Sequence, residues 1–137
     1  MTAPIVFNSA HSGRNYPERF LKMTRLDELS IRQSEDAFVD ELFGRAPHLG
    51  TPLLRAHFPR AYLDVNREPW ELDPQMFTEP LSDRFNTTSP RVAAGLGTIA
   101  RVVAENKPIY RERLTLEDAR MRIEGIYIPY HATLQRL

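Results

Sequence analysis

The apolar residues of this chain gather in short runs that predict small β-strands. Five segments have this character: residues 4–9, 52–58, 60–65, 98–104 and 108–114. The first run ends in the polar turn formers Asn8 and Ser9, which indicates a buried strand that opens into a loop. Pro59 joins the second and third runs tightly, and residues 105–107 separate the last two.

Apolar residues at helical spacing predict two longer helices. The first begins after the candidate N-cap Ser34, and its apolar positions run from Phe38 to Ala46, where Pro47 and Gly50 end it. The second begins after Thr115, a candidate cap. Its apolar face is formed by Ala119, Ile123, Ile126, Tyr130, Leu134 and Leu137. Pro129 should kink or split this second helix, because proline cannot donate a helical hydrogen bond.

The order of these elements predicts one unit of the α/β class. Strands and helices alternate along the chain, and the sequence contains no repeat or linker, so residues 1–137 are expected to form a single unit. Residues 68–90 hold four prolines and many polar side chains, which indicates an ordered but irregular excursion.

Composition narrows the classes of function. The 18 basic and 18 acidic residues cancel, which argues against a nucleic-acid-binding surface because such surfaces are basic. The apolar runs are far shorter than the about 20 residues of a membrane span, and nothing at the start resembles a signal peptide. A cytoplasmic protein without membrane or nucleic-acid partners is therefore expected. Because cysteine is absent, any metal must be held by His, Asp and Glu.

His11 is the first candidate for chemistry. It lies just after the first predicted strand, where open α/β sheets place their sites, and an imidazole on such a rigid base can bind a metal. The alternative is a loop histidine that only bonds to backbone. Glu35 and Asp36 are the next candidates, as metal ligand or general base. Their alternative is favourable interaction of acidic residues with the dipole at a helix N-terminus.

The densest polar segment is residues 60–67, Arg-Ala-Tyr-Leu-Asp-Val-Asn-Arg. Strand alternation would place Tyr62, Asp64 and Asn66 on one face, and Arg67 follows them. A carboxylate, an amide and a guanidinium together can hold an amino-acid-like substrate. An edge strand with a structural Arg–Asp pair is the alternative. His131, which lies beside two tyrosines, is expected to be packed structure more than a ligand.

Taken in order, the motifs resemble the N-formylglutamate amidohydrolase family over essentially the whole chain. The motifs are Phe-Asn-Ser-Ala-His-Ser-Gly at 7–13, Asp at 36 with Val-Asp-Glu-Leu-Phe at 39–43, Arg-Ala-Tyr-Leu-Asp-Val-Asn-Arg at 60–67, Glu-Leu-Asp-Pro at 71–74, Arg-Val-Ala-Ala-Gly-Leu-Gly-Thr-Ile at 91–99, Ile-Tyr-Arg at 109–111 and Tyr-Ile-Pro-Tyr-His at 127–131. The resemblance implies a mixed sheet flanked by helices, similar to zinc-dependent exopeptidases. It also implies hydrolysis of N-formyl-L-glutamate to formate and glutamate in a histidine-degradation route.

The resemblance also implies roles for individual residues. His11 becomes the best metal ligand, for a divalent metal that is expected to be zinc, and Asp36 becomes a second ligand. An acidic side chain, Asp36 or Glu35, would carry the proton of the attacking water. Asp64 and Asn66 would line the site. The arginines would pair with the substrate carboxylates: Arg67 first, then Arg91 and Arg111.

Length is the largest departure from the family pattern. Family members run to roughly twice 137 residues, and their second half carries another candidate metal ligand, so this chain is predicted to be the N-terminal part of an amidohydrolase. Two ligands would bind a metal weakly, since catalytic zinc usually has three protein ligands. Two alternatives follow: a non-catalytic ligand-binding or interaction domain that self-associates, and an amidase for another N-acyl amino acid.

Overall fold

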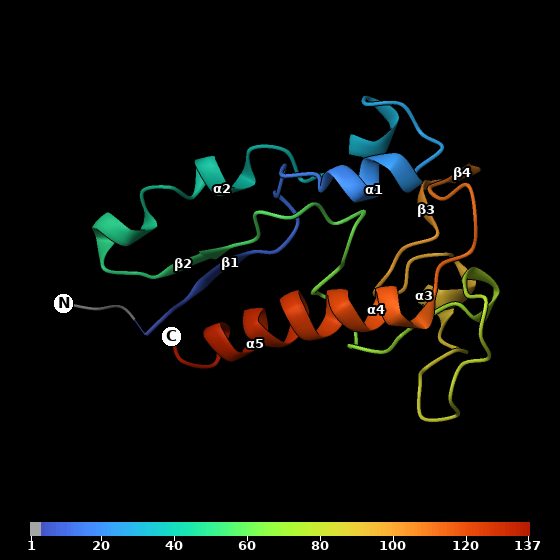
Figure 1. Ribbon diagram of the computed structural model, residues 1–137. Helices are drawn as coiled ribbons and strands as arrows, with labels where there is room; N and C mark the ends of the chain where they lie inside the picture. The colour runs from blue at the N-terminus through green and yellow to red at the C-terminus, as the bar shows by residue number, and fades with distance from the viewer. Residues whose placement is uncertain (1–3) are drawn as a thin grey trace.

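The computed structural model describes residues 4–137, and its first strands form a small parallel sheet (Figure 1). β1 (Phe7–Ser9) lies beside β2 (Leu53–Arg55), with Phe7 opposite Leu53 and Ser9 opposite Arg55. Both strands fall within predicted runs but are shorter than predicted. The ring of Phe7 packs against that of Phe43, 5.1 Å between centroids, and ties the sheet to the helical segment between its strands.

A second, antiparallel pair joins β3 (Val102–Ala104) to β4 (Lys107–Pro108). Asn106 in the connecting turn has φ 55°, a left-handed conformation that asparagine tolerates well. The strand predicted over 108–114 ends at once, because Pro108 cannot donate to a ladder. Within residues 4–137 the strands thus form two separate two-stranded sheets, where a single mixed sheet was predicted.

The strand predicted over 60–65 does not form. Residues 60–62 are in a turn, and the amides of Tyr62 and Leu63 both donate to the carbonyl of Pro59. These local bonds take the place of a ladder with a neighbouring strand, so the alternation of exposed and buried positions fails. Asp64, predicted on the same face as the exposed Asn66, is buried together with its neighbours Leu63 and Val65.

Most helices before residue 115 are short. They are α1 (Glu18–Met23), η1 (Ser30–Arg32), α2 (Val39–Leu42), η2 (Ala46–Leu49), η3 (Pro74–Met76) and α3 (Pro90–Ala93). The helix predicted from Ser34 is split into α2 and η2. Ser34 does not cap it, because the residue before α2 is Phe38, which adopts a left-handed φ of 64°. Pro47 lies in the first turn of η2 and Gly50 ends it, as predicted.

One long helical element closes the fold along one side of the molecule (Figure 1). It consists of α4 (Leu116–Arg122), the π-helical turn η4 (Ile123–Tyr127) and α5 (Ile128–Leu134). Thr115 caps it as predicted, its hydroxyl accepting from the amide of Asp118 at 3.1 Å. Pro129 lies in the first turn of α5, just past the π turn, and the helical element continues through it, so the predicted split does not occur. No helix of residues 4–137 is long and apolar enough to cross a membrane.

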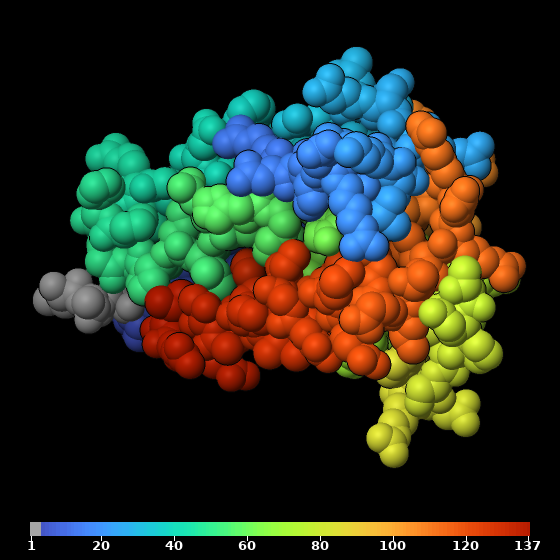
Figure 2. Space-filling view, viewed as in Figure 1, coloured from blue at the N-terminus to red at the C-terminus, as the bar shows by residue number. Residues whose placement is uncertain are grey.

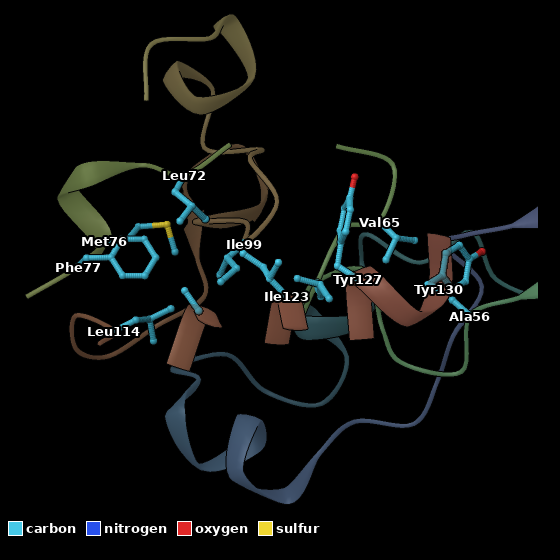
Figure 3. Packing of buried hydrophobic residues seen from close by; sticks show 12 residues of the cluster. Ala56, Val65, Leu72, Met76, Phe77, Ile99, Leu114, Ile123, Tyr127 and Tyr130 are labelled. Carbon is cyan, nitrogen blue, oxygen red and sulfur yellow. The ribbon is translucent and has the colours of Figure 1, made fainter. Parts of the chain in front are cut away.

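The main core lies between this terminal helix and the irregular middle of the chain (Figure 3). Ile123 on the helix is fully buried, as are Leu63, Leu72 and Ile99. In the space-filling view, the terminal helix packs along the green segment that contains and follows β2 (Figure 2).

Replacing Thr115 by Val tests how much the cap stabilises this helix. The substitution keeps the branched shape but removes the oxygen that accepts from Asp118, so the free energy of unfolding should fall by about 1 kcal/mol. Urea unfolding measures the change. Thr133→Val on the exposed face of α5 is the control, because the Thr133 hydroxyl donates only to Pro129 within the same helix. Equal losses in the two variants would contradict the capping role.

Candidate functional site

The loop after β1 is held firmly against the segment after β2. The carbonyl of Ser9 accepts from the amide of Ala56, and the amide of Asn15 donates to the carbonyl of His57 at 2.9 Å. Between them, Gly13 lies so close to Phe58 that a Cβ would stand 2.0 Å from its carbonyl oxygen. His11 therefore projects from a rigid loop at the carboxyl end of a strand, the position that the sequence predicted.

The His11 ring lies between two carboxylates. Its Nε2 is 2.8 Å from Oδ1 of Asp64, and its Nδ1 is 3.5 Å from Oδ2 of Asp36. An ionised carboxylate only accepts, so Nε2 carries the proton of that hydrogen bond. In the neutral ring, Nδ1 then keeps a lone pair directed toward Asp36. The backbone amide of Asp36 also donates to the His11 carbonyl at 3.0 Å, which ties the two residues together.

Asp64 is the buried partner, with 3% of its side chain exposed. Oδ2 accepts from Nε of Arg60 at 3.0 Å, and Oδ1 also accepts from the amide of Asn66 at 2.9 Å. Burial alone would raise the pKa of Asp64, but the hydrogen bond from His11, the hydrogen bond from the Asn66 amide and the charge of Arg60 outweigh it and lower the pKa. Asp64 therefore stays ionised and fixes the tautomer of His11.

The free nitrogen of His11 and the Asp36 carboxylate fit a divalent metal. Asp36 is half exposed, with 53% of its side chain accessible, so its oxygens are free to coordinate. Bonds of about 2.0–2.1 Å at a tetrahedral angle separate two zinc ligands by about 3.4 Å, close to the 3.5 Å between Nδ1 and Oδ2. A carboxylate behind a metal-binding imidazole is the usual orienting partner. Within residues 4–137, no group of three or more such ligands is assembled.

A cavity of about 300 Å³ lies beside this pair. Its polar rim consists of Gln33, Ser34, Glu35, Asp36, Arg60 and Asp64, and its apolar wall of Leu96, Gly97, Ala100, Val102 and Val103. A small molecule with a polar head and a short apolar or acyl group would fit these dimensions and this lining.

Comparison with known proteins agrees with the motif order. The family model for N-formylglutamate amidohydrolase matches residues 3–137. This chain belongs to that family. It is also similar to the crystal structure of N-formylglutamate amidohydrolase from Ralstonia eutropha JMP134, with 35% sequence identity and a TM-score of 0.89. The match covers 98% of this chain and 47% of that one, so this chain spans about half the length of that relative. No curated protein matches the sequence.

Of the residues that the family resemblance singled out, the structure brings His11, Glu35, Asp36 and Asp64 to one place. Glu35 lines the cavity, but its side chain is 5% exposed and accepts from the Tyr16 hydroxyl at 2.6 Å, with Arg32 at 3.3 Å. Burial and this bond to Glu35 raise the pKa of Tyr16. These contacts make Asp36, and not Glu35, the accessible carboxylate beside His11.

Arg67 and Asn66 lie close to the site, and in the structure both make hydrogen bonds to other groups of the protein. The Arg67 guanidinium donates to the carbonyls of Leu96 and Asn66, each at 2.9 Å, and lies 3.6 Å from Asp64. It is thus engaged in holding the loops around Asp64. The Asn66 side chain is exposed, while its backbone amide supports Asp64.

The structure does not bring Arg91 or Arg111 to this cavity. Arg91 approaches Glu71 at 3.9 Å, and Arg111 donates to the carbonyl of Thr24 at 2.9 Å and lines a different cavity. Neither arginine lines the cavity beside Asp36, and their contacts with the substrate stay a prediction. The assignment came from the family motifs and from the pairing of arginine with carboxylates, and neither tells which way a loop directs its side chain.

Sequence reasoning missed Arg60 as a cavity residue. Arg60 lies on the cavity rim and pairs with Asp64, four residues later in the same motif. That spacing was the available signal, but it was assigned to a strand, in which residues four apart lie far from each other. The turn at 60–62 brings the two side chains together.

Proposed function

We propose that this chain carries the metal-binding half-site and substrate cavity of an enzyme that hydrolyses N-formyl-L-glutamate to formate and L-glutamate, a step of histidine degradation. The observation that carries the proposal is the His11 ring, oriented by buried Asp64 and facing Asp36 at 3.5 Å. The family match supports the reaction class. The metal is proposed to be zinc, because imidazole and carboxylate are common zinc ligands.

His11 and Asp36 would hold the metal, which when bound polarises the formyl carbonyl and lowers the pKa of a water molecule. Asp64 keeps Nε2 of His11 protonated, so that Nδ1 remains a ligand. The water oxygen adds to the formyl carbon as its proton passes to a carboxylate. We assign this role to Asp36, the accessible acid at the site, through the oxygen Oδ1, while Oδ2, which faces Nδ1 of His11, would hold the metal. Return of the proton to the amide nitrogen releases glutamate as the C–N bond breaks.

Arg60 is the proposed partner of a substrate carboxylate. It lies on the cavity rim, and its Nε is used by Asp64 at 3.0 Å. The remaining N–H groups of the guanidinium can donate to a second carboxylate in the paired geometry that arginine favours. The apolar wall of Gly97, Ala100 and Val103 leaves room for a small acyl group such as formyl.

Replacement of His11 or Asp36 tests the proposal directly. His11→Ala and Asp36→Ala should each weaken zinc binding at least about 100-fold, since each removes a ligand and second-shell changes alone cost 10- to 100-fold. Competition with a chromophoric chelator measures the affinity, and formate release measures activity. His48→Ala is the control, because His48 is exposed on η2. Unchanged zinc affinity in the His11 variant would refute the metal site.

The activity assay, run with and without zinc, separates two alternatives. A non-catalytic ligand-binding domain would bind N-acyl amino acids without releasing an acid and without dependence on zinc. An amidase for a different N-acyl amino acid would keep the zinc dependence but release another acid, so a panel of N-acyl glutamates and N-formyl amino acids identifies the acyl and amino-acid parts.

A further inference from the structure

The terminal helix contacts the segment around Asp64, residues 62–67, through three side chains. Nη1 of Arg122 donates to the carbonyl of Tyr62 at 3.0 Å, and Oη of Tyr127 donates to the carbonyl of Arg67 at 2.5 Å. Nε2 of His131 lies 2.8 Å from the carbonyl of Val65, which can only accept, so Nε2 is the donor. Figure 3 shows Tyr127 beside Val65. The bonded carbonyls lie on both sides of Asp64.

These bonds replace the ladder that a strand would have provided. Residues 62–67 pair with no strand in the part of the chain that the structure describes. Their amides use local or loop partners, as when Asp64 donates to the carbonyl of Thr98 at 2.8 Å. Buried carbonyls need donors, and here the helix supplies them. Side chains of the helix therefore hold the carbonyls of the segment around Asp64, while its amides are held by loop partners.

The π-helical turn aligns these donors. Arg122 and Tyr127 are five residues apart, which in a regular α-helix would rotate them about 140° from each other at 100° per residue. A π turn bonds residue i to i+5 and so brings such residues onto one side. Tyr127 and His131 are four apart in ordinary helical spacing, and their rings stack with centroids 4.4 Å apart.

We propose that Tyr127 and His131, placed by the π turn beside Arg122, are positioning residues that act on His11 through Asp64. The proposal rests on the proposed function in one respect, namely that His11 binds a metal through Nδ1. It gives a role to the Tyr-Ile-Pro-Tyr-His motif, whose histidine lies outside the cavity. Loss of either donor frees a carbonyl within three residues of Asp64, that of Val65 or that of Arg67, and loosens the carboxylate that orients the imidazole.

Arg122 itself is too deeply embedded to serve as a test. Its side chain is 0% exposed and lies 2.5 Å from Asp118, with the Tyr62 ring 4.2 Å from its guanidinium carbon. Replacing it would leave a buried charge unpaired and unfold the core. Tyr127 and His131 allow milder changes. Phenylalanine at 127 keeps the ring and removes only the hydroxyl donor, and phenylalanine at 131 keeps an aromatic side chain, slightly larger than imidazole, that has no N–H donor.

The experiment compares Tyr127→Phe and His131→Phe with the control Thr133→Val on the same helix. Each Phe variant should bind zinc more weakly by up to about 10-fold, the lower limit for a residue bonded directly to a ligand, because the effect reaches His11 only through Asp64, while the control stays unchanged. His131→Gln, which restores an N–H donor, should recover part of the loss. In metal-free protein, the ¹⁵N shifts of the His11 ring should show an Nε2-protonated tautomer that becomes mixed in the Phe variants.

A purely structural role gives a different pattern. Lower melting temperatures with unchanged zinc affinity and unchanged His11 ring shifts would overturn the proposal, and so would an equal effect of Thr133→Val. If the wild-type chain binds no zinc, the proposed metal site fails, yet the His11 ring shifts still decide whether Tyr127 and His131 position the imidazole. If one Phe variant does not fold, the other gives the result.

Discussion

Replacing Asp64 by Asn is expected to lower the free energy of unfolding by about 3–5 kcal/mol, the usual result of removing one partner from a buried ion pair. Asp64 is buried and faces Arg60 at 3.0 Å and Arg67 at 3.6 Å. An amide side chain leaves both guanidinium groups without a counter-charge. Whichever way this amide turns, its NH₂ group, which can only donate, faces another donor. Urea unfolding measures the loss, and zinc binding should weaken in parallel because His11 loses its orienting carboxylate.

The pH dependence of this loss has a definite sign. The pKa of Asp64 is lower in the folded protein than in an unfolded chain, where it is about 3.9. Its stabilisation is therefore complete above that value and disappears as the pH falls through the folded pKa. The difference between wild type and Asp64→Asn, measured with chelator present, should be constant near neutral pH and shrink in acid. A difference that grows in acid would contradict this account.

Asp83→Asn provides the matched control. Asp83 is exposed in the irregular segment, so the same change of carboxylate to amide should alter stability by less than about 0.5 kcal/mol. If both variants lost the same stability, the effect would come from the change in net charge and not from the Asp64 contacts.

Replacing Gly13 by Ala is expected to disrupt the His11 loop and to cost about 3 kcal/mol, the upper part of the range for overpacking. The new Cβ would stand 2.0 Å from the carbonyl oxygen of Phe58 and 2.7 Å from the carbonyl carbon of His57. These atoms belong to the backbone, so the clash cannot be relieved by turning a side chain. The loop must move, and His11 moves with it, so zinc binding should fall as well.

Gly125→Ala is the control for the same chemical change. A Cβ at Gly125 meets no atom within 4 Å, and the residue lies within the helical η4 segment. Because alanine favours helix over glycine, this variant should gain up to about 1 kcal/mol. Thermal and urea unfolding of the two variants should give changes of opposite sign. A stable Gly13→Ala variant with wild-type zinc affinity would show that the loop is not rigid.

Local patterns predicted the elements whose stability is local. The terminal helix and its cap at Thr115 both follow from side-chain spacing and backbone chemistry within a few residues. The position of His11 after β1 was predicted for the same reason. The prediction of a strand over 60–65 was wrong. A ladder needs a partner strand, and here local turn bonds to Pro59 take the place of the ladder.

The sequence by itself determined the family, through an ordered set of motifs, and the donor types of the site: imidazole, carboxylate and guanidinium without thiolate. Only the tertiary structure decided which groups meet. It joined His11 to Asp64 across 53 residues, turned Arg111 toward another cavity, and set His131 against Val65. These contacts depend on how loops pack against the core. The spacing of residues along the chain does not encode the distances between side chains that lie far apart in the sequence.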